Sequence, residues 1–147
     1  MGFTPGGAAT CGNGGAFWQG LSSEKSKIGL GVSCYDRELV KSGESADMFA
    51  RKLSDQFLAT GKVIEQKDGR NIRNFKCSML VLDLRPGTFE ATIERRLAIM
   101  IYWSNEEKRV IVVSFNTAKS DWETYKPILS RIVSSIKIDA KGKPEGN

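Results

Sequence analysis

The stretch VIVVSFNTAKSDWETYKPILSRIVSSIK, residues 110–137, changes its hydrophobic period halfway along. Its first part, residues 110–116, is rich in β-branched residues, which are enriched in strands. Its second part repeats apolar residues at steps of three and four, as one face of a helix does. The apolar residues of this face are Trp122, Tyr125, Ile128, Leu129, Ile132, Val133 and Ile136. The stretch therefore predicts a strand followed by a helix that packs on the sheet, with Ile132 and Val133 buried.

The predicted helix has a recognisable start. SDWE, residues 120–123, matches the capping box, in which Ser and Glu side chains each bond to a backbone N–H at the helix start. Pro127 lies too deep for the first turn of a helix that begins at Asp121, and proline inside a helix removes a hydrogen bond. We therefore expect a separate first turn, then a kink or restart at Lys126-Pro127.

Strands precede this stretch. Residues 91–103 form a long Ile-rich segment that SNEEKR joins to the strand at 110–116. Residues 62–84 predict two strands around Asp68-Gly69, a dipeptide that tolerates the positive φ of a hairpin turn. Consecutive strands with short turns predict an antiparallel sheet.

One more helix and one more strand lie upstream. Apolar residues from Ala46 to Phe57 recur at helical spacing; Ser45 can cap this helix, and Gly61 is expected to end it as a left-handed cap. KIGLGVSCY, residues 27–35, alternates as a half-buried strand does. Strand, helix, four strands and helix predict one α+β domain in which helices cover an antiparallel sheet.

The Gly-rich stretch GFTPGGAATCGNGG, residues 2–15, is not a phosphate loop. A P-loop needs Lys and Ser or Thr after its glycines, and a dinucleotide fingerprint needs a strand before them. We expect residues 1–26 to be a mobile segment, residues 27–138 to be the domain and residues 139–147 to be a solvated tail.

Length and composition fit one globular domain. The chain has 147 residues, 40% hydrophobic and 27% charged, which allows a core without metal or disulfide staples. No apolar run is long enough to cross a bilayer, and we see no basic-then-apolar stretch of the signal-peptide type before the domain in this sequence. The favoured localisation is exported, or periplasmic, with any signal segment missing from this sequence, and the cytoplasm is the alternative.

Basic residues gather in one predicted hairpin. The net charge is +5, and residues 62–76 carry +3 of it. Only Phe75 could stack there on a base, so no nucleic acid is expected as a partner. The hairpin is either solvated or a docking patch for an acidic partner. Its candidate partner-binding residues are Lys67, Arg70, Arg73 and Lys76.

The three cysteines have no zinc or redox spacing. In an oxidising compartment Cys11 and Cys34 could pair, which would attach the Gly-rich segment to the domain. In a reducing compartment all three would be free, and we prefer the unpaired state. Cys77, inside an apolar strand, is expected to act as a small buried hydrophobe.

Catalytic groups are scarce. The chain has no His, which excludes Ser-His-Asp and Cys-His schemes. Glu106 and Glu107 are expected to be solvated turn residues. Asp83 shares its alternation with apolar residues, so it is either buried with a partner or exposed where the strand ends, and we favour exposure. No enzyme activity, cofactor or metal site is expected.

Residues 110–137 resemble the C-terminal signature of the PsbP-like superfamily. That group includes a photosystem II extrinsic protein, a Ran-binding nuclear-import factor, and DcrB-like bacterial lipoproteins and secretion chaperones. Ile136 stands where the family usually has Phe, and the likeness covers about residues 45–138. It implies a three-layer α/β/α sandwich. The matching residues, in order, are Phe115, Thr117, Tyr125, Pro127, Ile128, Ile132, Val133, Ser135 and Lys137.

The resemblance implies a non-catalytic protein-binding or assembly module of a bacterial envelope or secretion system. Its partner would be another protein, bound through a sheet edge, the basic hairpin or the N-terminal segment. The alternative is a small apolar-ligand carrier with a pocket between sheet and helices, lined by Trp18, Tyr102 and Trp103. The oligomeric state stays open.

Overall fold

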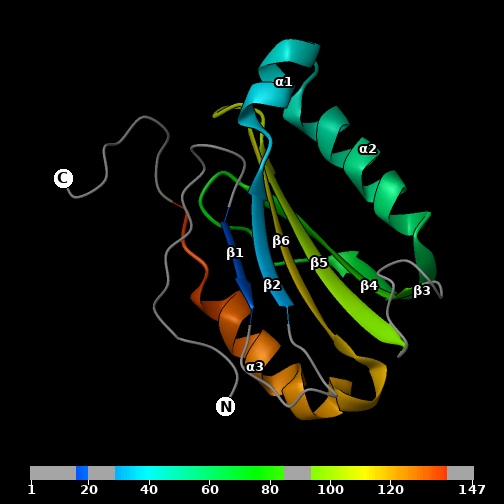
Figure 1. Cartoon of the computed structure of the whole chain (residues 1–147). Coiled ribbons are helices and arrows are strands. Elements are labelled where there is room, and N and C mark those ends of the chain that lie inside the picture. Colours follow the sequence, from blue (N-terminus) through cyan, green and yellow to red (C-terminus); the bar gives the residue numbers. More distant parts are fainter. Residues whose placement is uncertain (1–15, 20–28, 85–93, 139–147) are drawn as a thin grey trace.

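A computed structural model describes residues 16–19, 29–84 and 94–138 of the chain (Figure 1). Most of the expected N-terminal segment, and the whole of the expected tail at residues 139–147, lie outside the described residues. The described residues therefore comprise the predicted domain without residues 27, 28 and 85–93, together with one short strand before it.

The architecture is an antiparallel sheet with helices packed against it, which confirms the predicted α+β class. The strands lie in the order β1-β2-β6-β5-β4-β3, and every neighbouring pair is antiparallel. In chain order the elements are β1 (Ala16–Gln19), β2 (Gly29–Cys34), α1 (Asp36–Ser42), α2 (Ala46–Leu58), β3 (Gly61–Asp68), β4 (Lys76–Leu84), β5 (Arg95–Ser104), β6 (Arg109–Ala118), the 3₁₀ turn η1 (Lys119–Asp121) and α3 (Trp122–Ser135).

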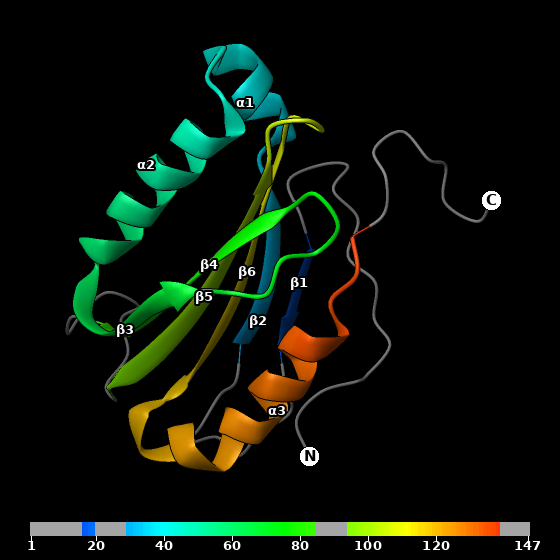
Figure 2. The same ribbon diagram turned by 180° about the vertical axis from the view of Figure 1, so that it is seen from behind.

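The core is divided between the two faces of the sheet, because successive side chains of a strand point to opposite sides. Along β5, Ile99 and Ile101 pack with buried residues of α1 and α2, whereas Met100 packs with buried residues of α3. We call these sides the α2 face and the α3 face. Figures 1 and 2 show α2 and α3 against opposite sides of the strands.

The helix α2 begins as predicted, with the Ser45 side chain accepting a hydrogen bond from the Met48 N–H at 3.2 Å. Its predicted end is wrong. Ala59, in a right-handed conformation, follows the last helical residue, and Gly61 opens β3 instead. A Cβ at Gly61 would collide with the backbone carbonyl of Asp83, so close strand pairing explains this glycine.

Two elements were not predicted. The helix α1 occupies a stretch read as polar connection, and Leu39 is its one buried residue, which leaves no apolar period to detect. Gly43, with φ of 70°, ends it as a left-handed cap. The strand β1 lies within the segment expected to be mobile and pairs with β2.

The β3–β4 hairpin exists, but its turn is not at Asp68-Gly69. Positive φ occurs at Arg73 instead, at 50°, within a loop of residues 69–75. The Gly69 N–H donates to the Cys77 carbonyl at 2.9 Å, and a Cβ at Gly69 would collide with the Cys77 Sγ. Gly69 therefore continues the strand pairing and allows close approach to Cys77.

The start of α3 differs from the predicted capping box. The separate first turn is confirmed as η1, but Asp121 precedes α3, and no side chain caps the helix. The helix then continues through Pro127 without a restart. Leu129 is buried, whereas Ile132 and Val133, expected to be buried, are partly exposed. None of the described helices combines the length and the apolar character needed to cross a membrane.

Candidate partner-binding surfaces

Arg70, a predicted partner-binding residue, binds the end of α3. Its Nη2 atom donates to the Ser134 carbonyl at 3.2 Å and to the carbonyls of Val133 and Ile136 at 3.5 Å. The last carbonyls of a helix have no helical partners and carry its partial negative charge. Arg70 therefore supplies a C-terminal cap from a loop distant in sequence.

Arg73, also predicted to bind a partner, has several contacts within the chain. Its Nε donates to the Ile138 carbonyl at 3.1 Å, and its Nη1 lies 2.9 Å from a carboxylate oxygen of Glu107. Its guanidinium also lies over the ring of Phe75, 5.6 Å from the centroid. Arg73 thus connects the β3–β4 loop to the residues after α3 and to the β5–β6 turn.

The β5–β6 turn makes polar contacts with the β3–β4 loop and with the start of α2. Glu106 accepts a hydrogen bond from the Asn74 side chain at 3.0 Å, and the Glu107 side chain is 14% exposed, so the two carboxylates are not simply solvated as expected. On the α2 face, Asn105 accepts from the Asp47 N–H at 3.0 Å. The turn therefore holds the start of α2 and the β3–β4 loop together.

All four predicted partner-binding residues are exposed, although Arg70 and Arg73 also contact other parts of the chain. Lys67 is exposed and has a 3.5 Å ion pair with Glu65, a contact of small energetic weight at the surface. Lys76 is exposed at the start of β4. The basic hairpin therefore has two exposed arginines that contact the end of α3 or the residues after it, and two exposed lysines.

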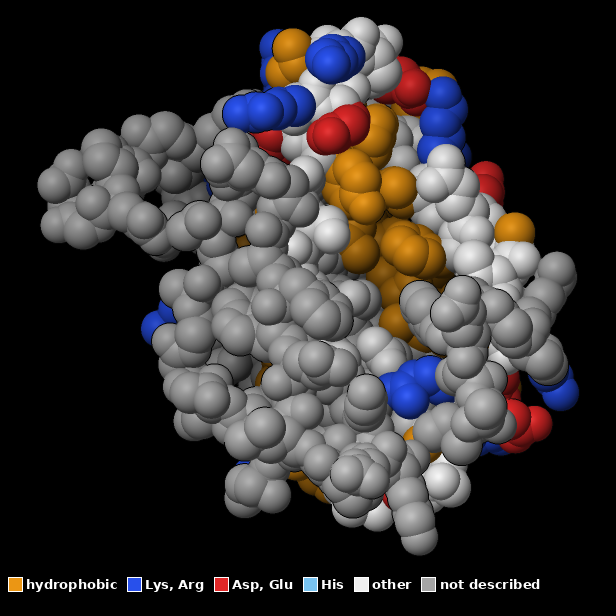
Figure 3. Space-filling view, viewed as in Figure 1, with side chains coloured by type: hydrophobic (Ala, Val, Ile, Leu, Met, Phe, Trp, Pro, Cys, Tyr) orange, Lys and Arg blue, Asp and Glu red, His pale blue; other side chains and the backbone are white. Residues whose placement is uncertain are grey.

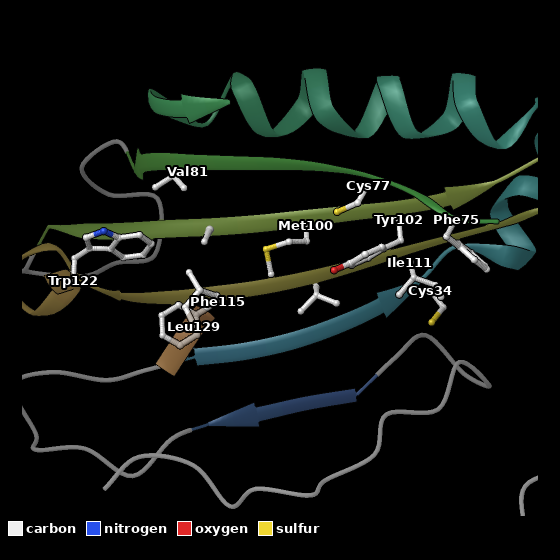
Figure 4. Packing of buried hydrophobic residues seen from close by; sticks show 12 residues of the cluster. Cys34, Phe75, Cys77, Val81, Met100, Tyr102, Ile111, Phe115, Trp122 and Leu129 are labelled. Carbon is white, nitrogen blue, oxygen red and sulfur yellow. The ribbon is translucent and has the colours of Figure 1, made fainter. Parts of the chain in front are cut away.

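The cysteines differ in state. Cys34 is disulfide-bonded, against the unpaired state that we preferred from the spacing. Cys11, its predicted partner, lies outside the described residues, so the Cys11–Cys34 pairing stays a prediction. Cys77 is a free thiol, 3% exposed on the α3 face, which confirms the expected buried hydrophobe (Figure 4). Burial raises the pKa of Cys77 to about 11, so it is protonated at neutral pH.

Asp83 is half-buried in an ion pair, and the predicted exposure is wrong. Arg96, its cross-strand neighbour, donates to its two oxygens at 2.7 and 3.2 Å, and the Lys119 Nζ lies at 3.5 Å. The hydrogen bond from Arg96 lowers the pKa of Asp83 despite partial burial. The carboxylate is therefore ionised and structural, without the raised pKa of a general acid.

Chemistry is also sparse elsewhere in the described residues. They contain no group of three or more His, Cys, Asp and Glu side chains placed to hold a metal ion. A shallow depression of about 350 Å³ on α3 is lined by Ser130, Arg131, Ser134 and Ser135. The hydroxyls of Ser134 and Ser135 donate to carbonyls of their own helix at 2.9 and 2.8 Å. The protons of both hydroxyls are thus directed at backbone carbonyls and not at a side-chain base.

The α2 face carries an open strip of hydrophobic surface, which we call the apolar furrow. Figure 3 shows it running between α2 and the strands β2 and β6. Tyr35 and Phe49 contact one another there, with ring centroids 5.7 Å apart. The partly buried hydrophobic residues that pack on this face are Tyr35, Phe49, Phe57, Leu58, Leu84 and Trp103. Helical and strand periodicity predicted several of these residues, but only as core residues and not as part of an open surface.

The pocket residues named from the sequence do not come together. Tyr102 and Trp103 are neighbours on β5, and Tyr102 packs on the α3 face whereas Trp103 packs on the α2 face. The side chain of Trp18 lies outside the described residues. The predicted pocket is therefore not formed by Tyr102 and Trp103 together.

The edge of the sheet at β3 is the other conspicuous surface. Every residue of β3 after Gly61 is exposed, including Val63 at 41% and Ile64 at 43%. The pairing with β4 shifts between Val63 and Glu65, which makes Ile64 the extra residue of a β-bulge.

Fold and surfaces together define an α+β protein with a six-stranded antiparallel sheet and two candidate binding surfaces. No family model and no curated protein sequence matches the chain. One solved structure that it resembles is described as a protein of unknown function, PA94 from Pseudomonas aeruginosa, and as a putative regulator. The two are 15% identical with a TM-score of 0.61, over 84% of this chain and 82% of that one. The likeness concerns the fold alone.

Proposed function

We propose that the chain is a non-catalytic protein-binding module with the three-layer α/β/α arrangement of the PsbP-like superfamily. The observation that carries this proposal is the apolar furrow. Contiguous hydrophobic surface left open on a soluble domain is typical of a site that a partner covers. The internal contacts of Arg70 and Arg73 argue against the basic hairpin as the main docking surface.

The furrow fits an apolar segment of another protein. The part of it that Figure 3 shows is open to solvent, whereas small-ligand sites usually enclose most of the ligand in a concave cavity. The aromatic residues that are partly buried on this face, Tyr35, Phe49 and Trp103, are of the types enriched at binding hot spots and interface cores. A carrier of a small apolar ligand is the second candidate, because the same hydrophobic lining would also hold such a molecule.

The setting that we propose is a bacterial envelope or secretion system, where the module would act as an accessory or chaperone-like protein. The resemblance of residues 110–137 supports this setting. The disulfide at Cys34 supports an oxidising compartment, because disulfides are rare in reducing ones.

Co-purification with a matched pair of variants tests the furrow. Phe49→Glu places a charge in the furrow, whereas Val40→Glu makes the same kind of change on α1 at a side chain outside it. We expect Phe49→Glu to lose the partner protein and Val40→Glu to keep it, with both variants folded by circular dichroism. Equal retention by both variants would contradict the proposal, and native mass spectra that show a small apolar molecule would favour the carrier.

A further inference from the structure

We propose that β3 is a self-association edge, where a second copy of the chain adds its own β3 antiparallel and extends the sheet. β3 is the last strand in the sheet order, paired with β4 on one side. Of the described large hydrophobic residues that are exposed, Val63 and Ile64 are the two that lie on a strand, and the others, Val40 and Met48, lie on helices.

The bulge at Ile64 determines to which face of the sheet the charged side chains of β3 point. Lys62 lies opposite Asp83, and Glu65 lies opposite Val81, so both pair with alternate residues of β4 on the α3 face. In a regular strand, residues three apart would point to opposite faces. The extra residue instead puts Lys62 and Glu65 on the same face.

This arrangement is self-complementary. With a twofold axis between residues 63 and 64, Lys62 faces Glu65 of the second copy, twice, and Val63 faces Ile64. Residues opposite each other in an antiparallel pair share a face, and the bulge meets that requirement for Lys62 and Glu65.

Other registers are less favourable. An axis at Glu65 would bring two carboxylates together, and an axis at Ile64 would place Val63 against Glu65. An axis at Gln66 would pair Glu65 with Lys67 but would place Ile64 against Asp68. Lysines and bulges normally keep sheet edges from pairing with other chains. Here the same features favour the register with its axis between residues 63 and 64 over these alternatives.

The dimer should be weak. One strand pair buries less than the roughly 1,000 Å² expected of a stable interface, so we expect a dissociation constant on the order of micromolar to millimolar. The interface uses no residue of the apolar furrow, so the failure of this proposal and that of the proposed function are distinguishable.

Sedimentation velocity over about 10 µM to about 1 mM tests the pairing by charge exchange. Lys62→Glu should weaken dimerisation at least about tenfold, because both symmetry-related pairs become repulsive. Glu65→Lys should do the same, and the double variant Lys62→Glu/Glu65→Lys should restore the dimer. Lys76→Glu, the same charge change on an exposed residue of β4, is the control and should leave it intact. A monomer at every concentration, or a double variant no better than the single ones, would overturn the proposal.

Discussion

Arg70 and Arg73 should hold the β3–β4 loop against the end of α3, and we call their contacts the latch. In the double variant Arg70→Gln/Arg73→Gln, the cation at the helix terminus and the ion pair with Glu107 are both lost. An exposed cation at a helix end contributes about 0.3–1 kcal/mol, and an exposed ion pair about 0.2–1 kcal/mol. Both arginines are substantially exposed, so we add the two exposed-site contributions and expect a total loss of about 0.5–2 kcal/mol.

The reactivity of the Cys77 thiol measures how often the β3–β4 loop opens away from α3. Its thiol is buried beneath the loop that carries both arginines, and Gly69 lies directly against its sulfur. A loss of about 0.5–2 kcal/mol corresponds to roughly 2–30-fold more opening. Alkylation of Cys77, followed by mass spectrometry of its peptide, should accelerate by about that factor.

The control is Lys76→Gln, which removes an exposed charge next to Cys77 and should leave the alkylation rate unchanged. Low concentrations of urea should hardly change the rate in the double variant, because the opening is local. If the double variant reacted within about twofold of the natural chain, the latch would be refuted.

Three further predictions concern stability. Leu129→Ala should lower the free energy of unfolding by about 2–4 kcal/mol in urea melts, because Leu129 is 3% exposed. Ile132→Ala should lower it by less, because Ile132 is only partly buried. An equal loss in the two variants would contradict the difference in burial between these residues. Deletion of residues 1–15 should lower the Tm as much as reduction of the intact chain does, if Cys11 is the partner of Cys34; reduction without effect on Tm would argue against that bridge. Asp83→Asn should destabilise the chain at neutral pH, where the natural chain has an ionised Asp83 paired with Arg96. The difference in stability should disappear as the pH falls through the lowered pKa of Asp83, because protonation removes the stabilisation that the ionised carboxylate provides. A difference that persists in acid would contradict the role of this ion pair.

Regular periodicity accounts for the elements that the sequence predicted. The helix α2, with Ser45 at its start, and the strands β4, β5 and β6 each carry enough apolar residues to show a period. The helix α1 has one buried residue, and β1 has four residues in all, so neither carries a detectable pattern.

The surfaces were harder to predict, because they depend on contacts between distant residues. Arg70 and Ser134 are 64 positions apart, and nothing local to either residue indicates that they meet. The apolar furrow arises because α2 leaves part of one sheet face open, which is a property of how the elements are placed (Figure 3). Charge clustering in residues 62–76 predicted an exposed ribbon, which the structure has, but it did not indicate that Arg70 and Arg73 also contact the end of α3 and the residues after it.

Photocrosslinking from the furrow tests the central claim, that this chain binds a protein partner through its α2 face. A benzophenone amino acid would replace Phe49 in the furrow or, as a control, Arg131 on the exposed side of α3. We predict one protein adduct of defined mass from position 49, competed by unlabelled chain, and none from position 131. Adducts from position 131 with none from position 49 would contradict it.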